Sequence, residues 1–429
     1  MTSIQPEMES VDWPVPRWYQ ARQPQWIGDH QLSLLENGAE YFMALQQAIA
    51  QAREDIWFET YIFHDDLISR QVAEALIAAS QRGVAVQLLI DGFGSAEVLV
   101  RLQQWFAGTP VEFRVFQPLT HWRHWLTRNK LRRLHRKMVV IDQRLGFIGG
   151  INILDDYHDP NHGPLEFPRL DFAVRLQGPL VQRMLQTMHQ LWWRSQRQDR
   201  ESIELGATEV TRSLQKIYQT FRQLTAARSA PEKISRAPVR AALALRDNVR
   251  QRRSIEKSYL QAIAHARYEI ILANAYFFPG ARFRRALCHA AQRGVKVSLL
   301  LQGRVEYPLQ HYATQAMYDE MLNAGIRIFE YQKSFLHAKV GVIDDHWSTV
   351  GSSNIDPFSL LLAYEANLVI LDSDFSRQLK TCLQQAIQDS RELTPSEHAQ
   401  RSRMIRLFNR LAMLLLRFGV SLSGEARRY

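Results

Sequence analysis

The sequence His-Arg-Lys-Met-Val-Val-Ile-Asp at residues 135–142 recurs as His-Ala-Lys-Val-Gly-Val-Ile-Asp at residues 337–344. The apolar residues after each lysine predict a strand that runs into the core. On a strand, positions i and i+2 face the same side, so each histidine should lie beside its lysine. A glycine-containing turn that ends in asparagine follows both copies at the same distance, at residues 149–152 and 351–354.

Each motif lies inside a longer repeat. Gln-Ala-Ile-Ala-Gln-Ala-Arg at residues 47–53 returns as Gln-Ala-Ile-Ala-His-Ala-Arg at residues 261–267. In the first half, a strand-like run at residues 56–63 is followed by a helical stretch ending in Gln-Arg-Gly-Val at 81–84 and by an apolar strand at 86–90. In the second half, the matching segments are residues 270–277, a stretch ending at 292–295, and residues 297–301. Helices that alternate with buried strands predict an α/β fold of two similar, pseudo-symmetric lobes.

Composition shifts divide the chain into five parts. We expect an N-terminal leader, a first lobe, a linker that contains two prolines, a second lobe and a basic C-terminal segment, at residues 1–27, 28–225, 226–250, 251–395 and 396–429. The last segment interleaves arginines with apolar residues. It is predicted either to lie in a membrane interface or to pack as a helix on the protein's own core.

Composition also limits the classes of function. In 429 residues, 46% are hydrophobic and 22% charged, which excludes a wholly disordered chain. Two cysteines exclude a disulfide scaffold and a zinc site built from cysteines, and they suit a reducing compartment. A net charge of +10 predicts a polyanionic partner, either nucleic acid or anionic lipid. With neither a signal peptide nor an apolar run of roughly 20 residues, we expect no insertion across a bilayer.

Two paired imidazoles and ammonium groups suit the chemistry of a phosphodiester. One histidine can attack phosphorus while the other protonates the leaving alcohol. The lysines and asparagines can stabilise the charge that develops on the phosphate oxygens. This set lacks the further ligand that zinc or magnesium needs, so no metal and no cofactor are expected. One such motif could be an ordinary buried strand, but two in matched context favour a site.

The duplicated motif resembles that of the phospholipase D superfamily, over nearly the whole chain. Within it, the likeness is to bacterial cardiolipin synthases, especially the B type, and it rests on residues 34–38, 274–280 and 345–357. The resemblance implies two phospholipase D-like lobes, each a mixed β-sheet flanked by helices. It also implies one active site at the interface between the lobes.

The resemblance implies a role for each residue of the site. The catalytic set is His135, Lys137, Asp142, His337, Lys339 and Asp344, although the two aspartates are implied to be more structural than chemical. Support and phosphate binding fall to Asn152, Ser352, Asn354, Asp171 and Glu365, and the last two are implied to orient the histidines. Gly150 stands where the second lobe has Ser352, so the first lobe should lack a hydroxyl donor to phosphate. His135 is favoured as the nucleophile, with the choice left open.

The substrate is predicted to be lipid more than nucleic acid. Residues 121–133 mix tryptophan with arginine and lysine before the first motif, as in a membrane-interface belt, although they could stack on bases or form a plain loop. The resemblance implies transfer of a phosphatidyl group between two phosphatidylglycerols, at the cytoplasmic face of a bacterial inner membrane. A phospholipase D hydrolase, another phosphatidyltransferase, a metal-independent nuclease and a non-catalytic membrane scaffold remain alternatives. Oligomeric state is not predicted.

Overall fold

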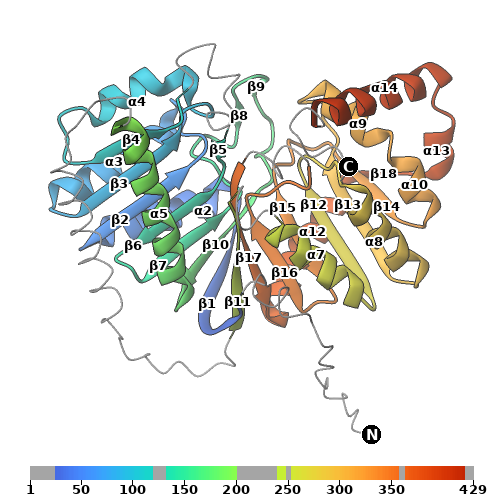
Figure 1. Cartoon of the computed structure of the whole chain (residues 1–429), viewed down its shortest axis with the longest axis horizontal. Coiled ribbons are helices and arrows are strands. Elements are labelled where there is room, and N and C mark those ends of the chain that lie inside the picture. The colour runs from blue at the N-terminus through green and yellow to red at the C-terminus, as the bar shows by residue number, and fades with distance from the viewer. Residues whose placement is uncertain (1–24, 119–131, 201–238, 248–252, 357–362, 421–429) are drawn as a thin grey trace, which may run out of the picture.

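The structure is a computed structural model that describes residues 25–118, 132–200, 239–247, 253–356 and 363–420. Apart from the small pair β8 (His158–Asp159) and β9 (Gly163–Pro164), its strands form one continuous mixed sheet through the middle of the molecule, with helices on both faces (Figure 1). The predicted α/β fold of two similar lobes is therefore confirmed. Residues 121–131 of the tryptophan-rich stretch, and residues 226–238 of the expected linker, lie outside the described part.

The first lobe contributes seven strands to the sheet, in the spatial order β1-β10-β7-β6-β2-β3-β4. These are β1 (Ile27–Glu36), β2 (Asp55–Thr60), β3 (Ala85–Asp91), β4 (Glu112–Phe116), β6 (Lys137–Ile141), β7 (Leu145–Gly149) and β10 (Phe172–Gln177). The strands β2, β3 and β4 are parallel, and the others pair antiparallel. The helices are α2 (Asn37–Gln51), α3 (Leu67–Gln81), α4 (Leu99–Phe106) and α5 (Leu180–Arg200).

The second lobe repeats this order as β11-β17-β16-β15-β12-β13-β14 and adds β18 at the edge. These are β11 (Val239–Arg246), β12 (Glu269–Asn274), β13 (Lys296–Gln302), β14 (Arg327–Tyr331), β15 (Lys339–Ile343), β16 (Trp347–Gly351), β17 (Ala363–Leu371) and β18 (Ser390–Leu393). The helices are α7 (Ser254–His265), α8 (Ala281–Gln292), α9 (Pro308–Gln315), α10 (Tyr318–Asn323), α12 (Ser373–Gln388), α13 (Pro395–Ala399) and α14 (Arg403–Val420). Both predicted motif strands form, as β6 and β15.

The prediction of a linker is wrong for residues 239–246. They form β11, which pairs with β17 over its whole length and meets β1 of the first lobe. The segment reads Val-Arg-Ala-Ala-Leu-Ala-Leu-Arg, in which three alanines and two arginines lower the strand propensity and make it resemble a connector in sequence. Neighbouring strands on both sides satisfy its backbone groups, and this tertiary pairing overrides its weak strand propensity.

The lobes share an apolar core. One cluster of buried residues joins Met138 and Ile148 of the first lobe to Leu336 and Val340 of the second. The small strand β5 (Arg133–Leu134) of the first lobe pairs with β17 of the second. The two halves therefore pack as one rigid unit, which fixes the ends of β6 and β15 relative to each other.

Candidate active site

Each motif histidine is held by a carboxylate from the opposite lobe. The pairing of β5 with β17 brings the backbone N–H of His135 to the carbonyl of Tyr364, at 3.0 Å. The next residue, Glu365, accepts a hydrogen bond from Nδ1 of the His135 ring at 3.0 Å. The crossed pairing brings residues far apart in sequence into one site.

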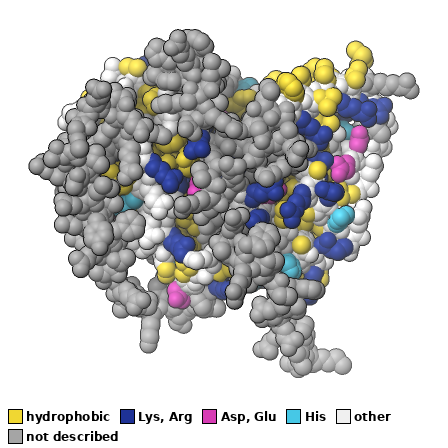
Figure 2. All heavy atoms as spheres, viewed as in Figure 1, with side chains coloured by type: hydrophobic (Ala, Val, Ile, Leu, Met, Phe, Trp, Pro, Cys, Tyr) yellow, Lys and Arg dark blue, Asp and Glu magenta, His cyan; other side chains and the backbone are white. Residues whose placement is uncertain are grey.

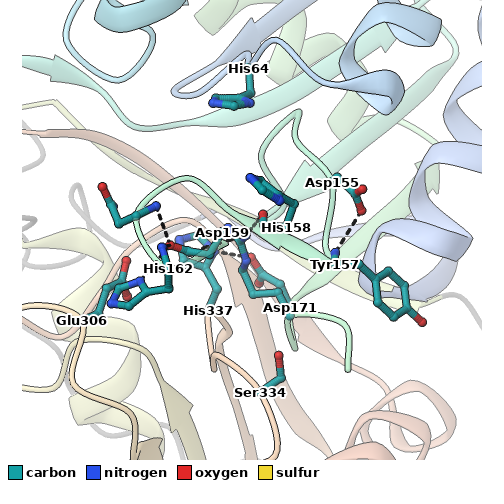
Figure 3. A network of polar contacts seen from close by, with 12 residues as sticks. His64, Asp155, Tyr157, His158, Asp159, His162, Asp171, Glu306, Ser334 and His337 are labelled. Atoms are coloured by element: carbon teal, nitrogen blue, oxygen red, sulfur yellow. Dashed lines mark hydrogen bonds and ion pairs between the residues drawn. The ribbon is translucent and has the colours of Figure 1, made fainter. Parts of the chain in front are cut away.

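The second histidine repeats this geometry with the lobes exchanged. The backbone N–H of His337 donates to the carbonyl of Leu170 at 2.8 Å. Its ring Nδ1 donates to Oδ2 of Asp171 at 2.6 Å, as Figure 3 shows. With Nδ1 occupied in both rings, Nε2 is the nitrogen left to exchange a proton or to attack.

The two lysines lie buried beside these histidines. Lys137 Nζ donates to the carbonyl oxygen of His135 at 3.0 Å, and Lys339 Nζ donates to that of His337. Burial, followed by repulsion from Lys339, lowers the pKa of Lys137 to about 7. Burial lowers the pKa of Lys339 to about 8, although Asp171 and Glu365 oppose the effect. This mutual influence means that both motifs face one site.

The electrostatics of the site favour a bound anion. Burial lowers the pKa of His135, with Glu365 opposing the shift. Burial, then Lys339 and Lys137, bring the pKa of His337 well below its ordinary value. A phosphodiester anion would offset this excess of positive charge and raise the pKa of both rings.

The downstream turns buttress the carboxylates. Ser352 Oγ donates to Glu365, so its hydroxyl supports the residue that holds His135. A Cβ added at Gly150 would lie 2.3 Å from Oδ1 of Asp171, so glycine is required at that position. Because the Ser352 hydroxyl donates to Glu365, its role toward phosphate stays a prediction, as does the absence of a matching donor at Gly150.

Both predicted asparagines are buried at the ends of strands next to the motif strands. Asn152 follows β7 and Asn354 follows β16. The side-chain oxygen of Asn152 accepts a hydrogen bond from the backbone N–H of Ile62 at 3.3 Å. Asn152 therefore braces the loop after β2, and its role toward phosphate stays a prediction.

The two motif aspartates bind backbone groups away from the motif histidines, and a catalytic role for them stays a prediction. Asp142 accepts hydrogen bonds from the backbone N–H groups of residues 53–55, and Asp344 from those of residues 267–269. Each lies past the far end of its motif strand, five residues after the lysine. The two aspartates tie the start of a neighbouring strand to the turn, which agrees with the structural role that the resemblance implied.

Four residues of the site were missed in the sequence. The ring of Tyr61 lies 4.7 Å from that of His135 and 5.3 Å from Lys137 Nζ.

Glu306 accepts a hydrogen bond from the hydroxyl of Tyr276 at 2.7 Å, and Glu306 affects the pKa of Lys339. Arg169 lowers the pKa of His337. Figure 3 shows Glu306, His162 and Asp171 around His337. Comparing the two repeats residue by residue would have pointed to Tyr61.

Among the described residues, no group of three or more His, Cys, Asp or Glu side chains is placed to hold a metal ion. Within the same part of the chain, no helix is both long and apolar enough to cross a membrane.

Comparison with known proteins identifies the family. A family model described as "Cardiolipin synthase, PLD-like domain" matches residues 45–165 and 259–387. Cardiolipin synthase B of Escherichia coli (strain K12) is 37% identical, over 83% of this chain and 80% of the relative. Cardiolipin synthase A of Pseudomonas putida (strain W619) is 29% identical, over 91% and 75%.

A solved structure supports the fold. The phosphatidylserine synthase of Haemophilus influenzae Rd KW20 superposes with a TM-score of 0.65 at 14% identity, covering 94% of this chain and 98% of that one. The family model accounts for more than half of the chain, and both of its matches contain one motif. The chain therefore belongs to the family of cardiolipin synthases with phospholipase D-like domains.

Proposed function

We propose that this protein is a phosphatidyltransferase that makes cardiolipin and glycerol from two molecules of phosphatidylglycerol. The observation that supports this most strongly is the crossed site, in which each histidine is held by a carboxylate of the other lobe beside two buried lysines. The likeness to cardiolipin synthase B supplies the choice of substrate.

In the first half-reaction, Nε2 of His135 attacks the phosphorus of one phosphatidylglycerol. The new phosphorus–nitrogen bond forms as the phosphorus–oxygen bond to glycerol breaks, and the leaving oxygen takes the Nε2 proton of His337. Lys137 and Lys339 stabilise the negative charge on the phosphate oxygens. The glutamate on His135 and the aspartate on His337 keep the rings in the required tautomer.

In the second half-reaction, the hydroxyl of another phosphatidylglycerol attacks the same phosphorus. Its proton passes to Nε2 of His337, and the phosphorus–nitrogen bond breaks to free His135. The two esters exchanged are similar in energy, so loss of glycerol draws the reaction forward. The site must hold the lipid alcohol in place of water for transfer to exceed hydrolysis.

The direct test uses purified full-length protein and vesicles of labelled phosphatidylglycerol, with products separated by thin-layer chromatography. We expect cardiolipin and glycerol in equal amounts. Phosphatidic acid alone would show a hydrolase instead, and cleavage of plasmid DNA without divalent metal would show a nuclease. If neither lipid nor DNA were converted, the remaining alternative would be a non-catalytic membrane scaffold.

We propose that the protein acts while bound to a membrane surface, through α14. The apolar side chains exposed along this helix are Met404, Ile405, Leu407, Phe408, Leu411, Leu414, Leu415 and Phe418. Only a narrow face, with Ala412 and Leu416, is buried against the protein. Figure 2 shows apolar side chains along the upper right edge, where α14 lies, with basic side chains below them.

The arginines of α14 lie along one side of that apolar face. Arg406, Arg410 and Arg417 recur at spacings of four and seven, so they share a side of the helix. An apolar face flanked by arginines matches a surface of anionic lipids. Figure 1 shows α14 at the same end of the molecule as β5, which leads into His135. Docking there would bring the site to the lipid head groups. The inner membrane and its cytoplasmic face stay predictions.

Vesicle sedimentation tests this surface. Leu411→Asp together with Phe418→Asp should weaken binding to phosphatidylglycerol vesicles by about 100-fold, because two apolar side chains that enter the lipid contribute on the order of 3 kcal/mol to binding. Leu67→Asp, at an exposed leucine on α3, is the matched control and should bind as the unmodified protein does. If the double variant bound vesicles as before but no longer formed a dimer, α14 would instead be covered by a second copy of the chain.

A further inference from the structure

The two lobes differ at the residue that follows β2 and β12. In the first lobe Glu59 pairs with Met138, and in the second Ala273 pairs with Val340, the residue that matches Met138 in the motif. Counting two residues on from each pair, Tyr61 of the first lobe corresponds to Ala275 of the second. Both flank a catalytic histidine: the ring of Tyr61 lies against His135, and the N–H of Ala275 bonds to the carbonyl of Ala338.

A pocket lies beside Ala275 in the second lobe. The ring of Tyr61 occupies the space beside His135, whereas the methyl group of Ala275 leaves room in the second lobe. The pocket there has a volume of about 30 Å³, which holds about two water-sized groups. Its walls include Ala275, Tyr276, Gln302, Glu306, Tyr307 and Thr314.

The pocket is built to accept hydrogen bonds from a neutral group. Oε2 of Glu306 accepts from the Tyr276 hydroxyl at 2.7 Å, and the carboxylate has a second oxygen that can accept another hydrogen bond. Burial raises the pKa of Glu306, while Tyr276, Arg169 and Lys339 oppose the shift. Figure 3 shows Glu306 near His162 and His337, which places the carboxylate on the side of the site where His337 lies. A carboxylate there repels phosphate oxygens and favours a hydroxyl.

We propose that this pocket binds the hydroxyl on the central carbon of the glycerol head group, with Glu306 as its acceptor, so that the neighbouring terminal oxygen is left to bond to phosphorus. The proposal rests on the proposed function and assigns the alcohol's place within it. The same pocket holds the glycerol that leaves and then the head group of the second phosphatidylglycerol.

The pocket also separates the roles of the histidines. In an in-line displacement at phosphorus, the attacking and leaving groups lie on opposite sides. The pocket borders Ala275, whose N–H donates to the carbonyl of Ala338 next to His337, whereas Tyr61 lies in the matching place against His135. His337 therefore exchanges the proton with the alcohol, and His135 forms the bond to phosphorus. The incoming hydroxyl oxygen bonds to phosphorus, its proton goes to Nε2 of His337, and the phosphorus–nitrogen bond breaks.

The test measures how the phosphatidyl group divides between lipid alcohol and water. Glu306→Gln keeps the shape of the side chain, and we expect it to lower the ratio of cardiolipin to phosphatidic acid at least about tenfold, since a hydrogen bond to a charged group contributes on that order. Ala275→Tyr copies the first lobe and fills the pocket, so it should lower the same ratio while water still reaches phosphorus. Glu392→Gln, at an exposed glutamate on edge strand β18, is the matched control.

The outcomes separate this proposal from the function on which it rests. If the unmodified protein makes no cardiolipin from phosphatidylglycerol, the proposed function fails. If it does, but Glu306→Gln and Ala275→Tyr both keep its product ratio, only the pocket assignment fails. Circular dichroism on each variant shows that it is folded.

Discussion

The two halves of the active site solve one problem with different side chains. Both hold a histidine through Nδ1 with a carboxylate of the opposite lobe. In one half the carboxylate is Glu365, supported by the hydroxyl of Ser352. In the other it is Asp171, packed against Gly150, where no side chain would fit. The longer acid is paired with a side chain, and the shorter acid with none.

This difference shows that the histidine positions are kept while the supports are exchanged. A carboxylate one methylene shorter must come closer to the turn, and glycine provides that space. The asymmetry continues after β2 and β12, where Tyr61 of the first lobe corresponds to Ala275 of the second. A duplicated fold has thus given two histidines equal placement and unequal surroundings, which suits two different chemical roles.

Replacing each histidine should have the largest effect. His135→Ala and His337→Ala should each lower cardiolipin synthesis by at least about 1,000-fold, because nucleophile and proton donor are both needed. The two should differ with a phosphodiester whose leaving group is a nitrophenol, since an acidic alcohol departs without a proton. Release of nitrophenol should return in His337→Ala and stay absent in His135→Ala.

That contrast can also fail in an informative way. If nitrophenol release returned in His135→Ala alone, His337 would be the nucleophile and His135 the proton donor. If it returned in neither variant, both rings would be needed before the bond to the leaving group breaks. Mass spectrometry of the phosphatidyl group trapped on the protein gives an independent test of which histidine is the nucleophile. The group should be found on His135 in the unmodified protein.

Exchanging the supports should have the next largest effect. Gly150→Ser places a Cβ against Oδ1 of Asp171, so the carboxylate must move from His337; we expect about 100-fold lower kcat and a loss of about 1–3 kcal/mol in the free energy of unfolding. Ser352→Gly only removes a hydroxyl that donates to Glu365, and about a tenfold loss is expected. Rates on phosphatidylglycerol and urea unfolding check both. Equal effects of the two substitutions would contradict the size argument.

The pH dependence should follow the two lysines. Burial lowers the pKa of Lys137 to about 7 and that of Lys339 to about 8, so kcat/KM should fall by about tenfold or more between pH 7 and 9 as their charge is lost. Stability should change in the opposite direction. Since an unfolded lysine keeps its proton up to about pH 10.5, the unfolded state binds more protons in this range and the free energy of unfolding rises with pH. A flat kcat/KM profile would contradict the burial of these charges.

Much of this architecture can be predicted from the repeat. The pairing of residues 47–53 with 261–267, and of the two motifs, predicts two similar α/β lobes and places each histidine with its lysine. The strand β11 could not be predicted, because its stability comes from β1 and β17, which are far away in sequence. Local composition there is that of a connector.

The site divides in the same way. The members of each motif could be predicted, because residues two apart on a strand share a face. The crossed pairs His135–Glu365 and His337–Asp171 depend on how β5 and the segment before β10 meet the opposite lobe, which the order of residues alone does not show. Glu306 lies in no stretch that carries the resemblance, and Tyr276, although it lies within residues 274–280, has no role implied by it; packing brings the two together.

The smallest effect on catalysis should come from the motif aspartates. Asp142 and Asp344 each accept three backbone N–H groups at the start of β2 or β12, away from the histidines. Asp142→Ala or Asp344→Ala leaves those donors without that acceptor and should lower the free energy of unfolding by about 1–3 kcal/mol. In a chain of this size that is a fall in Tm of about 1–3 °C. Because neither carboxylate reaches the phosphate, the rate per folded molecule should stay within about twofold. Thermal unfolding and rates measured on the same preparations test both parts, and a 100-fold loss of kcat at unchanged Tm would return the aspartates to the catalytic set.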